Sequence, residues 1–388
     1  MRILMLGSGS YRSSLTFRIV ELGKRLGAQG HDVSLMVPSA DKYNNFTAEK
    51  HPDVPGVRVL QPWQLHTTST TLNLLPYLFS SCVTLLRNRV DVIYLYKPTP
   101  ATILALVPKL LFRTPVVLDL DDLGSEVMEA QGQSSLQVRL VRLCEKLALR
   151  YADGVVVAST FLRNEVREQG VTKAVFILPN GVDVAEYPPV EPSKPRHALY
   201  FFGAINRLGL VESMLRALPE IIAKVPDTQL YMLGGGSALD ATKALAEELG
   251  VAGHITFSGW IDMFDAPRYA HFADLALCVQ PDVRTVRAAS NMKVFQYMAM
   301  GLVPVVSNVG DLPYYVNEGA AGVVVAPDNA QMLAAACVQY LQDDRKRTEL
   351  AKVARARVES LYSWHRLANE LDVFLSAQVS RKSSGAKI

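Results

Sequence analysis

The chain alternates short apolar runs with longer segments in which apolar residues recur every three or four positions. Runs of four or five apolar residues predict strands that are buried on both faces, and the period of the longer segments predicts helices packed along one side. In the first half, the runs that predict strands lie at residues 3–6, 33–37, 92–96, 116–120, 155–158 and 175–178. Strands and helices that alternate in this way are typical of a parallel, doubly wound sheet.

A proline-rich segment divides two series of such units. Pro188, Pro189, Pro192 and Pro195 fall close together, a composition that favours an extended connector. Beyond it the strand pattern restarts at residues 199–203, 229–233, 254–257, 275–279, 303–307 and 322–326. We therefore expect two Rossmann-like, doubly wound α/β domains that face each other across a central cleft.

The expected domain boundaries follow from this restart. We expect an N-terminal domain at residues 1–183, the connector at 184–197 and a second domain at 198–360. Residues 361–388 are expected to form a C-terminal helix that crosses back to the first domain and ends in a polar tail.

The composition excludes several classes of protein. With 388 residues, of which 49% are apolar and 20% charged, the chain is neither disordered nor collagen-like nor a small disulfide-stabilised domain. The net charge of +3 does not indicate a nucleic-acid surface, so we expect no nucleic-acid partner. The four cysteines, Cys82, Cys144, Cys278 and Cys337, are far apart, which favours reduced thiols over disulfides or a zinc site.

The N-terminus begins with a single arginine and a short apolar run that ends in glycine. This pattern lacks the longer apolar region and the cleavage site of a signal peptide, so we expect a cytoplasmic protein. The most apolar stretches do not predict a membrane span, because residues 74–86 are too few and residues 101–118 are interrupted by prolines and basic side chains.

Candidate chemistry is expected in the loops that follow the strands, because ligands of open α/β sheets bind beyond the carboxyl ends of the strands. Gly7, Ser8, Gly9 and Ser10 follow the first strand and precede a helix. Two interpretations stay open: a ligand-facing loop that presents a helix N-terminus to an anion, or a tight turn. The loop is a poor dinucleotide fingerprint, since Arg12 stands where the third glycine belongs.

Three carboxylates, Asp119, Asp121 and Asp122, lie at the end of the strand predicted at 116–120. Because like charges repel each other, such a group favours a functional role. Exposed at the edge of the sheet, the three side chains can orient sugar hydroxyls or a cation. The alternative is an Asx turn with one of them as a helix N-cap.

In the second domain, small residues follow two successive strands. Gly203, Asn206 and Arg207 follow the first strand, and Gly234 and Gly235 follow the second. Missing side chains let a phosphate approach the backbone, and a guanidinium offers anionic oxygens a forked set of donors. The alternative for Arg207 is an ordinary surface arginine.

Ser290, Asn291 and Lys293 open a predicted helix that also carries Gln296. A hydroxyl, an amide, an ammonium and a helix N-terminus can converge there on one anion, and the alternative is a cap beside a solvated lysine. Trp260 is expected either to form the wall of a nucleotide-base pocket or to pack in the core. The histidines stand at no recognisable spacing from a nucleophile, so we expect no histidine-activated nucleophile.

Several segments together resemble the motifs of a known family. Residues 179–183 read PNGVD, 257–260 read FSGW, 293–306 read KVFQYMAMGLVPVV and 362–364 read YSW. With the βαβ unit expected at 202–234, these segments are similar in order and spacing to retaining glycosyltransferases of the GT-B fold, in their large family 4. The resemblance extends over nearly the whole chain.

The resemblance implies a GT-B fold and an enzyme that transfers a hexosyl group, with retention of anomeric configuration and without a metal. The C-terminal domain is expected to bind a UDP- or GDP-sugar as co-substrate, with no resident cofactor. The N-terminal domain is expected to bind a glycan, a lipid-linked or a small-molecule acceptor, in polysaccharide or glycolipid biosynthesis. Fixed cations and backbone N–H groups can stabilise the leaving diphosphate in place of a metal ion.

The candidate site residues follow from the motifs and the resemblance together. The catalytic candidates are Asp119, Asp121, Asp122, Lys293 and Arg207. The donor-binding candidates are Gly7, Ser8, Gly9, Ser10, Gly203, Asn206, Gly234, Gly235, Trp260, Ile261, Ser290, Asn291, Val294 and Gln296. Among them, Lys293 and Arg207 are expected to supply the countercharge to the diphosphate.

The chain departs from the family pattern at four positions. Ala204 and Gly209 stand where the family has Arg and Lys, and Ala288 and Gln296 stand where it has paired glutamates that contact the donor sugar and the ribose. The rival interpretation is therefore a catalytically degenerate GT-B protein that binds a nucleotide-sugar or a partner glycosyltransferase. A Rossmann dehydrogenase is a third, disfavoured by the incomplete glycine fingerprint.

Residues 72–86 are strongly apolar and are followed by Arg87 and Arg89. They predict an amphipathic face that docks peripherally on an anionic bilayer, at the inner face of the cell membrane. The alternative, a core helix of the acceptor domain, stays open.

Overall fold

The computed structural model describes residues 1–8, 16–37, 56–60, 89–189, 197–207, 210–261, 265–270 and 273–385, with a few single positions between 79 and 87. The chain forms two compact units. Unit 1 comprises Met1–Asn180 and Trp364–Ile388, and unit 2 comprises Gly181–Ser363.

Unit 1 is built on a seven-stranded parallel sheet with the strand order β3-β2-β1-β4-β5-β6-β7. Its strands are β1 (Arg2–Leu6), β2 (Asp32–Met36), β3 (Val57–Leu60), β4 (Val92–Tyr96), β5 (Val116–Leu120), β6 (Gly154–Val157) and β7 (Ala174–Ile177). The order reverses between β1 and β4, as in a doubly wound sheet. The predicted strands of this half are confirmed, and β3 is an additional edge strand that the apolar pattern did not reveal.

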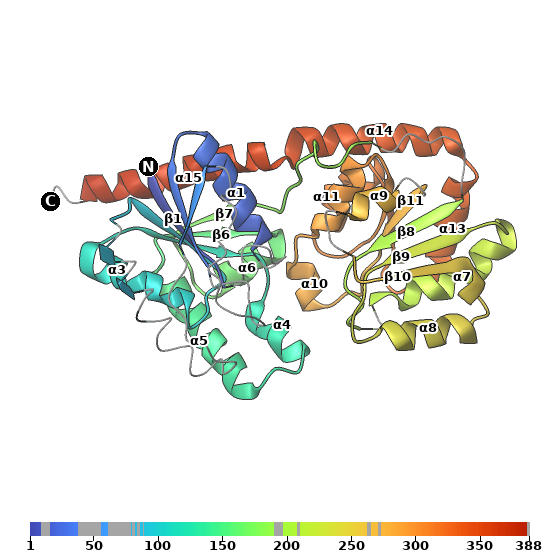
Figure 1. Ribbon diagram of the computed structural model, residues 1–388, viewed down its shortest axis with the longest axis horizontal. Helices are drawn as coiled ribbons and strands as arrows, with labels where there is room; N and C mark the ends of the chain where they lie inside the picture. The colour runs from blue at the N-terminus through green and yellow to red at the C-terminus, as the bar shows by residue number, and fades with distance from the viewer. Residues whose placement is uncertain are drawn as a thin grey trace, which may run out of the picture. The chain divides into compact units, whose positions relative to one another are not determined.

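Helices cover both faces of the sheet of unit 1. They are α1 (Phe17–Ala28), α3 (Leu106–Phe112), α4 (Gly124–Ala130), α5 (Ser135–Tyr151) and α6 (Thr160–Glu168). The last helix of the chain, α15 (Trp364–Gly385), also packs in this unit and lies beside α1 (Figure 1). Its Phe374 ring stacks on Phe176 of β7, with ring centroids 5.3 Å apart.

Unit 2 is built on a six-stranded parallel sheet with the order β10-β9-β8-β11-β12-β13, which reverses between β8 and β11. Its strands are β8 (Ala198–Phe202), β9 (Gln229–Leu233), β10 (Ile255–Gly259), β11 (Leu275–Cys278), β12 (Val303–Ser307) and β13 (Val323–Val325). Its helices are α7 (Glu212–Lys224), α8 (Leu239–Glu248), α9 (Ala266–Ala270), α10 (Arg284–Ala288), α11 (Met292–Ala299), α12 (Leu312–Tyr315), α13 (Ala330–Leu341) and α14 (Asp344–Leu361). The expected pair of doubly wound α/β domains is therefore confirmed.

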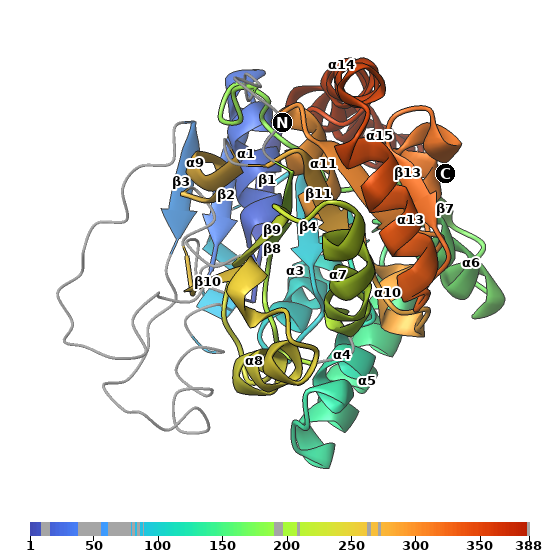
Figure 2. The same ribbon diagram turned by 90° about the vertical axis from the view of Figure 1, so that its right-hand side faces the viewer.

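The sheet of unit 2 has an apolar core on each face, because successive residues of a strand point to opposite sides. Leu199 and Phe201 of β8 lie in the core beneath α7 and α13, which pack side by side (Figure 2). Tyr200, between them in the chain, lies in the other core with residues of α11 and α14. Burial on both faces explains why the strands read as continuous apolar runs.

A buried ion pair joins α1 to the central strands of unit 1. Arg18 donates from Nε to Oδ2 of Asp119 at 2.8 Å, and the hydroxyl of Tyr94 donates to the same oxygen at 2.6 Å. The guanidinium also donates to the carbonyl oxygens of Leu178 at 2.7 Å and Pro179 at 3.0 Å. Burial alone lowers the pKa of Arg18, but the attraction of Asp119 outweighs it and holds the pKa above its usual value. Burial raises the pKa of Asp119, and the charge and hydrogen bond of Arg18, together with the Tyr94 hydroxyl, oppose this shift. Arg18 therefore stays charged, and its buried guanidinium depends on Asp119 as its countercharge.

Replacement of Asp119 by asparagine is expected to destabilise unit 1 by about 3–5 kcal/mol, because it leaves the Arg18 charge buried without a countercharge. The measurement is urea-induced unfolding. Asp91→Asn is the control, since the ion pair of Asp91 with Arg2 is exposed and its loss costs at most about 1 kcal/mol. Equal losses in the two variants would contradict the central role of the buried pair.

Candidate functional site

Two glycine-containing loops of unit 2 pack on each other at the carboxyl ends of β8 and β9. The N–H of Gly203 donates to the carbonyl oxygen of Leu233 at 2.9 Å, and the N–H of Ile205 donates to that of Gly235 at 2.9 Å. The N–H of Gly234 continues the chain of contacts to the carbonyl oxygen of Gly259, also at 2.9 Å. These bonds hold the ends of β8, β9 and β10 together at one edge of the sheet.

The loops approach so closely that a side chain on Gly203 or Gly234 would meet its neighbours. A Cβ atom on Gly234 would lie 2.0 Å from the carbonyl oxygen of Gly203. A Cβ on Gly203 would lie 2.3 Å from Nζ of Lys293. Both glycines have positive φ, +139° and +152°, in the region that disfavours other residues. The structure thus explains the small residues that the sequence places here.

Lys293, on the first turn of α11, points its ammonium into this edge of the sheet. Its Nζ lies against Gly203 and 4.8 Å from the centre of the Phe201 ring. Burial lowers the pKa of Lys293, and Cys278 at the end of β11 partly opposes this effect. The ammonium therefore lies between the ends of β8 and β11, where the strand order reverses. Such a point is where open α/β sheets bind their ligands.

Other predicted donor-binding residues surround the same edge. Trp260 is 79% exposed, and its backbone nitrogen would lie 3.4 Å from a Cβ atom on Gly235. Ile261 is half-buried and packs against the core that contains α11. Asn206 and Arg207 are exposed on the loop after β8. The structure thus brings Gly203, Gly234, Gly235, Trp260 and Lys293 together, with Asn206 and Arg207 on the adjoining loop.

The start of α11 lies beside these loops, but its residues differ in exposure. Asn291, the N-cap residue, is half-buried and makes no side-chain capping bond, so the interpretation of Asn291 as a helix cap is not supported. Ser290 is buried and its hydroxyl accepts a hydrogen bond from Tyr315 at 3.1 Å. The predicted donor contact of Val294 is also not supported, because its side chain is buried and its N–H donates to the carbonyl oxygen of Asn291.

Gln296 is only 3% exposed, and its amide donates to the hydroxyl of Tyr187 at 2.8 Å. The sequence predicted a contact with the donor ribose at this position. The structure places the amide in a buried hydrogen bond instead, with a tyrosine that sequence analysis did not single out. Ala288 is also buried. Their positions do not support a direct contact with donor hydroxyls.

The three carboxylates of unit 1 separate into two groups. The expectation that Asp119 is exposed is wrong, because it is fully buried against Arg18. Asp121 and Asp122 lie at the edge of the sheet and share the ammonium of Lys97, with shortest N–O distances of 3.1 and 2.8 Å. The N-cap interpretation is also wrong, since the N-cap residue of α4 is Leu123, which makes no side-chain capping bond.

The Lys97 cluster, formed by Lys97, Asp121, Asp122 and Tyr96, follows the ends of β4 and β5. Tyr96 donates its hydroxyl hydrogen to Asp121. Burial and the neighbouring Asp121 raise the pKa of Asp122 to about 6, although Lys97 opposes the shift. Lys97 was not predicted, and its positive φ of +52°, which turns the chain sharply after β4, has no signal in the sequence.

The loop after β1 is described only in part. Gly7 is buried, and a Cβ atom there would lie 2.6 Å from Cδ1 of Ile19 on α1. At Gly7 this supports the interpretation of a tight turn. Ser8 is half-buried, whereas Gly9, Ser10, Arg12 and Gly209 lie outside the described residues. Most of the stretch at 72–86 also lies outside them.

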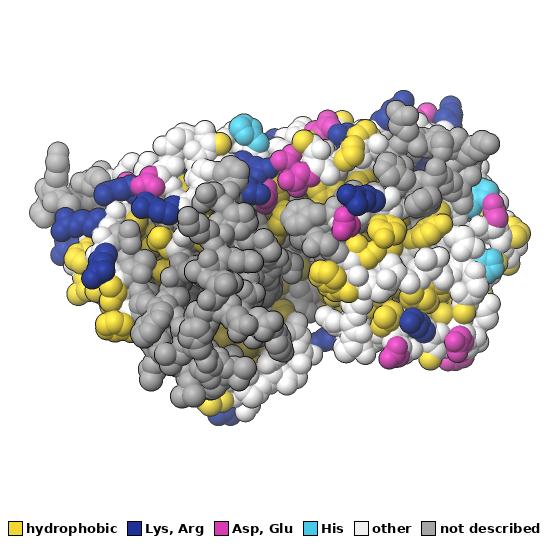
Figure 3. Space-filling model, in the orientation of Figure 1, with side chains coloured by type: hydrophobic (Ala, Val, Ile, Leu, Met, Phe, Trp, Pro, Cys, Tyr) yellow, Lys and Arg dark blue, Asp and Glu magenta, His cyan; other side chains and the backbone are white. Residues whose placement is uncertain are grey.

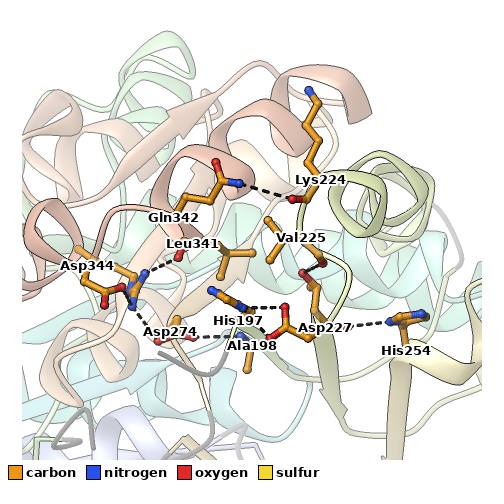
Figure 4. Close-up of polar contacts among 12 residues, drawn as sticks. His197, Ala198, Lys224, Val225, Asp227, His254, Asp274, Leu341, Gln342 and Asp344 are labelled. Carbon is orange, nitrogen blue, oxygen red and sulfur yellow. Dashed lines mark hydrogen bonds and ion pairs between the residues drawn. The ribbon is translucent and has the colours of Figure 1, made fainter. Parts of the chain in front are cut away.

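A further group of polar residues lies at the opposite, amino-terminal edge of the sheet of unit 2 (Figure 4). His197 contacts Asp227, with 2.7 Å between Nδ1 and Oδ1, and Asp274 accepts the N–H of Ala198 at 3.0 Å. These contacts join the starts of strands. They lie one strand length away from Lys293, so we assign them to the fold.

Within the described part of the chain, no group of three His, Cys, Asp or Glu side chains is arranged to hold a metal ion. Of the helices described, none has the length and apolar character needed to cross a bilayer. The four cysteines are free, and Cys144, Cys278 and Cys337 are buried.

Substitution of Gly203 by alanine is expected to lower the free energy of unfolding of unit 2 by about 1–3 kcal/mol, because alanine is strained at φ +152° and its methyl group would displace the end of the Lys293 side chain. Gly253→Ala is the matched control, since a Cβ atom there meets nothing within 4 Å and φ is not positive. Thermal unfolding measures both. Equal midpoints for the two variants would contradict the strained, closely packed backbone at Gly203.

Replacement of Asp122 by asparagine is expected to change how stability depends on pH. The raised pKa means that folded Asp122 holds its proton more tightly than unfolded Asp122, so its contribution to stability falls as the pH rises through about 6. Asparagine does not titrate, so the melting temperature of the variant relative to the wild type should be higher at pH 7.5 than at pH 5. Each kcal/mol of stability that the wild type loses between these two pH values should change this difference by about 2–4 °C. An equal difference at both pH values would contradict the shift.

Two domain families match the chain in succession. A glycosyl transferase 4-like domain matches residues 15–181, and a glycosyl transferases group 1 domain matches residues 196–343. A mannosyltransferase of Mycolicibacterium smegmatis that uses GDP-mannose and acts on phosphatidylinositol monomannoside is 27% identical over 244 residues, 58% of this chain and 63% of the relative. The match thus spans about three fifths of that relative's length.

Solved structures share the same fold. Sucrose-phosphate synthase of Thermosynechococcus elongatus superposes with a TM-score of 0.75 at 20% identity, over 100% of both chains. The Anabaena protein HepE, in complex with UDP-glucose, superposes with a TM-score of 0.73 at 17% identity, over 97% of this chain and 100% of that one. With the two domain matches, these likenesses show that the chain belongs to the glycosyltransferases of the GT-B fold, with a 4-like domain followed by a group 1 domain.

Proposed function

We propose that the protein is a retaining, metal-independent glycosyltransferase that moves a hexosyl group from a UDP- or GDP-sugar to a glycan or lipid-linked acceptor. The observation that carries the proposal is the position of Lys293. Its ammonium lies against the glycine loops between the ends of β8 and β11, where the sheet of unit 2 reverses its strand order. A diphosphate bound there meets a fixed cation and closely approachable backbone.

The proposed role of Lys293 is to stabilise the leaving diphosphate. Transfer breaks the bond between the anomeric carbon and the diphosphate oxygen, and it forms a bond from that carbon to the acceptor oxygen on the same face of the sugar. Negative charge develops on the diphosphate as the first bond breaks, and the acceptor hydroxyl gives up its proton to the departing diphosphate oxygen. Burial disfavours the charged form of Lys293 in the free protein, so an anion at the site restores a favourable environment for the ammonium.

The remaining donor contacts are proposed on the exposed part of the same edge. Asn206 and Arg207 extend from the loop after β8 and are suited to the outer phosphate oxygens. Trp260 presents a largely exposed indole beside Gly235, which suits stacking on a nucleotide base. The HepE complex supports a nucleotide-sugar ligand for this fold, since that protein was solved with UDP-glucose.

Unit 1 is proposed to bind the acceptor. Asp121 and Asp122 are the carboxylates of the Lys97 cluster that reach the surface, and carboxylate oxygens accept hydrogen bonds from sugar hydroxyls. The Mycolicibacterium relative, named for an acceptor that is a phosphatidylinositol mannoside, supports a lipid-linked acceptor. Such an acceptor implies that the protein acts in the cytoplasm at the inner face of the cell membrane.

The second candidate function is a GT-B protein that binds a nucleotide-sugar or a partner glycosyltransferase without catalysis. The family's paired glutamates are replaced by Ala288 and Gln296, and both residues are buried. A site that lacks these carboxylates has fewer groups to orient the donor sugar.

Replacement of Lys293 by alanine separates the two candidates. If the protein is an enzyme, the kcat of the Lys293→Ala variant should fall about 10²–10³-fold. The measurement is the release of UDP or GDP during donor hydrolysis or sugar transfer. Lys243→Ala is the matched control, because Lys243 also lies over a phenylalanine ring, at 5.9 Å from that of Phe257, but on the exposed helix α8. A wild-type protein that binds nucleotide-sugars and turns over none of them would overturn the catalytic proposal.

A further inference from the structure

Helix α5 of unit 1 exposes a row of leucines on the side that faces away from the core. Val138, Val141 and Ala148 of this helix are buried. Leu136, Leu140 and Leu143 are exposed by 67%, 44% and 51%. Their spacing of four and three residues aligns them along one line of the helix surface. A soluble helix normally turns polar residues to this side, so the row needs a partner.

A row of basic side chains runs beside the leucines. Arg139, Lys146 and Arg150 are exposed, and their spacing of seven and four residues places them along one flank of the leucine row. Glu145, the acidic residue of α5, is turned toward α4, where it accepts hydrogen bonds from the N–H and the hydroxyl of Ser125 at 2.9 and 2.7 Å. The six exposed side chains, which we name the basic leucine face, are therefore apolar and positive without an internal countercharge. They are Leu136, Leu140, Leu143, Arg139, Lys146 and Arg150.

The end of α3 adds exposed apolar surface near the end of α5. Lys109 of α3 forms an ion pair with Asp153, two residues beyond α5, which holds the two helix ends together. Leu110 and Leu111 follow Lys109 and are exposed by 73% and 62%. Figure 3 shows hydrophobic side chains on the surface over α3, with basic side chains beside them.

We propose that the basic leucine face docks unit 1 on an anionic lipid bilayer. Leucines at such a face enter the boundary between headgroups and acyl chains, while lysine and arginine remain among the anionic headgroups. The proposal rests on the membrane location in the proposed function, but it does not depend on Lys293 or on donor chemistry.

Charge favours a bilayer over a second copy of the chain. In a symmetric dimer the same face meets itself, so the row of Arg139, Lys146 and Arg150 would meet an identical basic row. Like charges placed opposite each other are unfavourable, and the face offers no acidic side chain to pair with them. An anionic membrane supplies many mobile countercharges over the whole face.

The test is co-sedimentation of the full chain with vesicles of phosphatidylcholine alone or mixed equally with phosphatidylglycerol, without any nucleotide-sugar. The wild type is expected to bind the mixed vesicles and to lose binding at high salt. The combined change Arg139→Gln, Lys146→Gln and Arg150→Gln should lower the partition coefficient on the order of tenfold or more, because each basic residue adds to the attraction of an anionic surface. The combined change Leu136→Ser, Leu140→Ser and Leu143→Ser should also lower the partition coefficient at low salt, because serine side chains do not enter the boundary between headgroups and acyl chains.

Matched controls change exposed residues elsewhere. Arg345→Gln with Lys346→Gln and Lys352→Gln removes three exposed charges from α14, and Val373→Ser removes an exposed apolar side chain from α15. Both should bind vesicles like the wild type. Since the glutamine and serine changes lie on the surface, equal melting temperatures are the check that the variants fold.

Three outcomes would overturn the inference. The first is equal binding of the wild type to neutral and anionic vesicles. The second is unchanged vesicle binding by both face variants, which are the triple glutamine and the triple serine variants. The third is a wild-type dimer, seen by light scattering, that the triple serine variant converts to a monomer. Sugar transfer to a soluble acceptor, measured without vesicles, should be unchanged in the face variants. Transfer without vesicle binding would refute the docking surface alone, and vesicle binding without transfer would refute the catalytic proposal alone.

Discussion

The close approach of the two glycine loops in unit 2 is the constraint on which the proposed donor site depends. The carbonyl oxygen of Gly203 occupies the space that a side chain on Gly234 would need, and the Lys293 ammonium occupies the space beside Gly203 itself. Packing of this kind holds a cation at the reversal point of the sheet before any ligand arrives. A charge that is already in place stabilises a developing anion without reorganisation, which is the main electrostatic advantage of an enzyme over water.

Unit 1 shows how burial divides similar side chains between structure and chemistry. Asp119 is surrounded by Arg18 and Tyr94, and its charge is fully used in joining α1 to the central strands. Asp121, two residues along the chain, lies beyond the end of the strand and shares Lys97 with Asp122. The first acid stabilises the fold, whereas the other two retain contact with the surface, where a ligand can reach them.

Much of the fold was predictable because a parallel sheet covered on both faces leaves a direct trace in the sequence. Its strands are continuous apolar runs, and the glycine loops follow them. The exception, β3, is a short strand at the edge of the sheet whose Arg58 is exposed, so it lacks that trace. Of the candidate site, the small residues were predictable from their place after the strands, and Lys293 from its place at the start of a predicted helix. Lys97 and Tyr187 were not, because only their contacts with distant parts of the chain distinguish them from ordinary residues.

The sequence by itself determined the type of each main element, the division into two α/β units and the family to which the chain belongs, since hydrophobic period and motif order are properties of neighbouring residues. Tertiary structure decided which polar side chains are buried and which are exposed. Asp119 meets Arg18 across 101 residues of chain, and Gln296 meets Tyr187 across 109. Such partners are chosen by the order of strands in the sheet and by the packing of helices on it. Local sequence carries no record of either, and so the roles of these charged and amide groups emerged only from the folded chain.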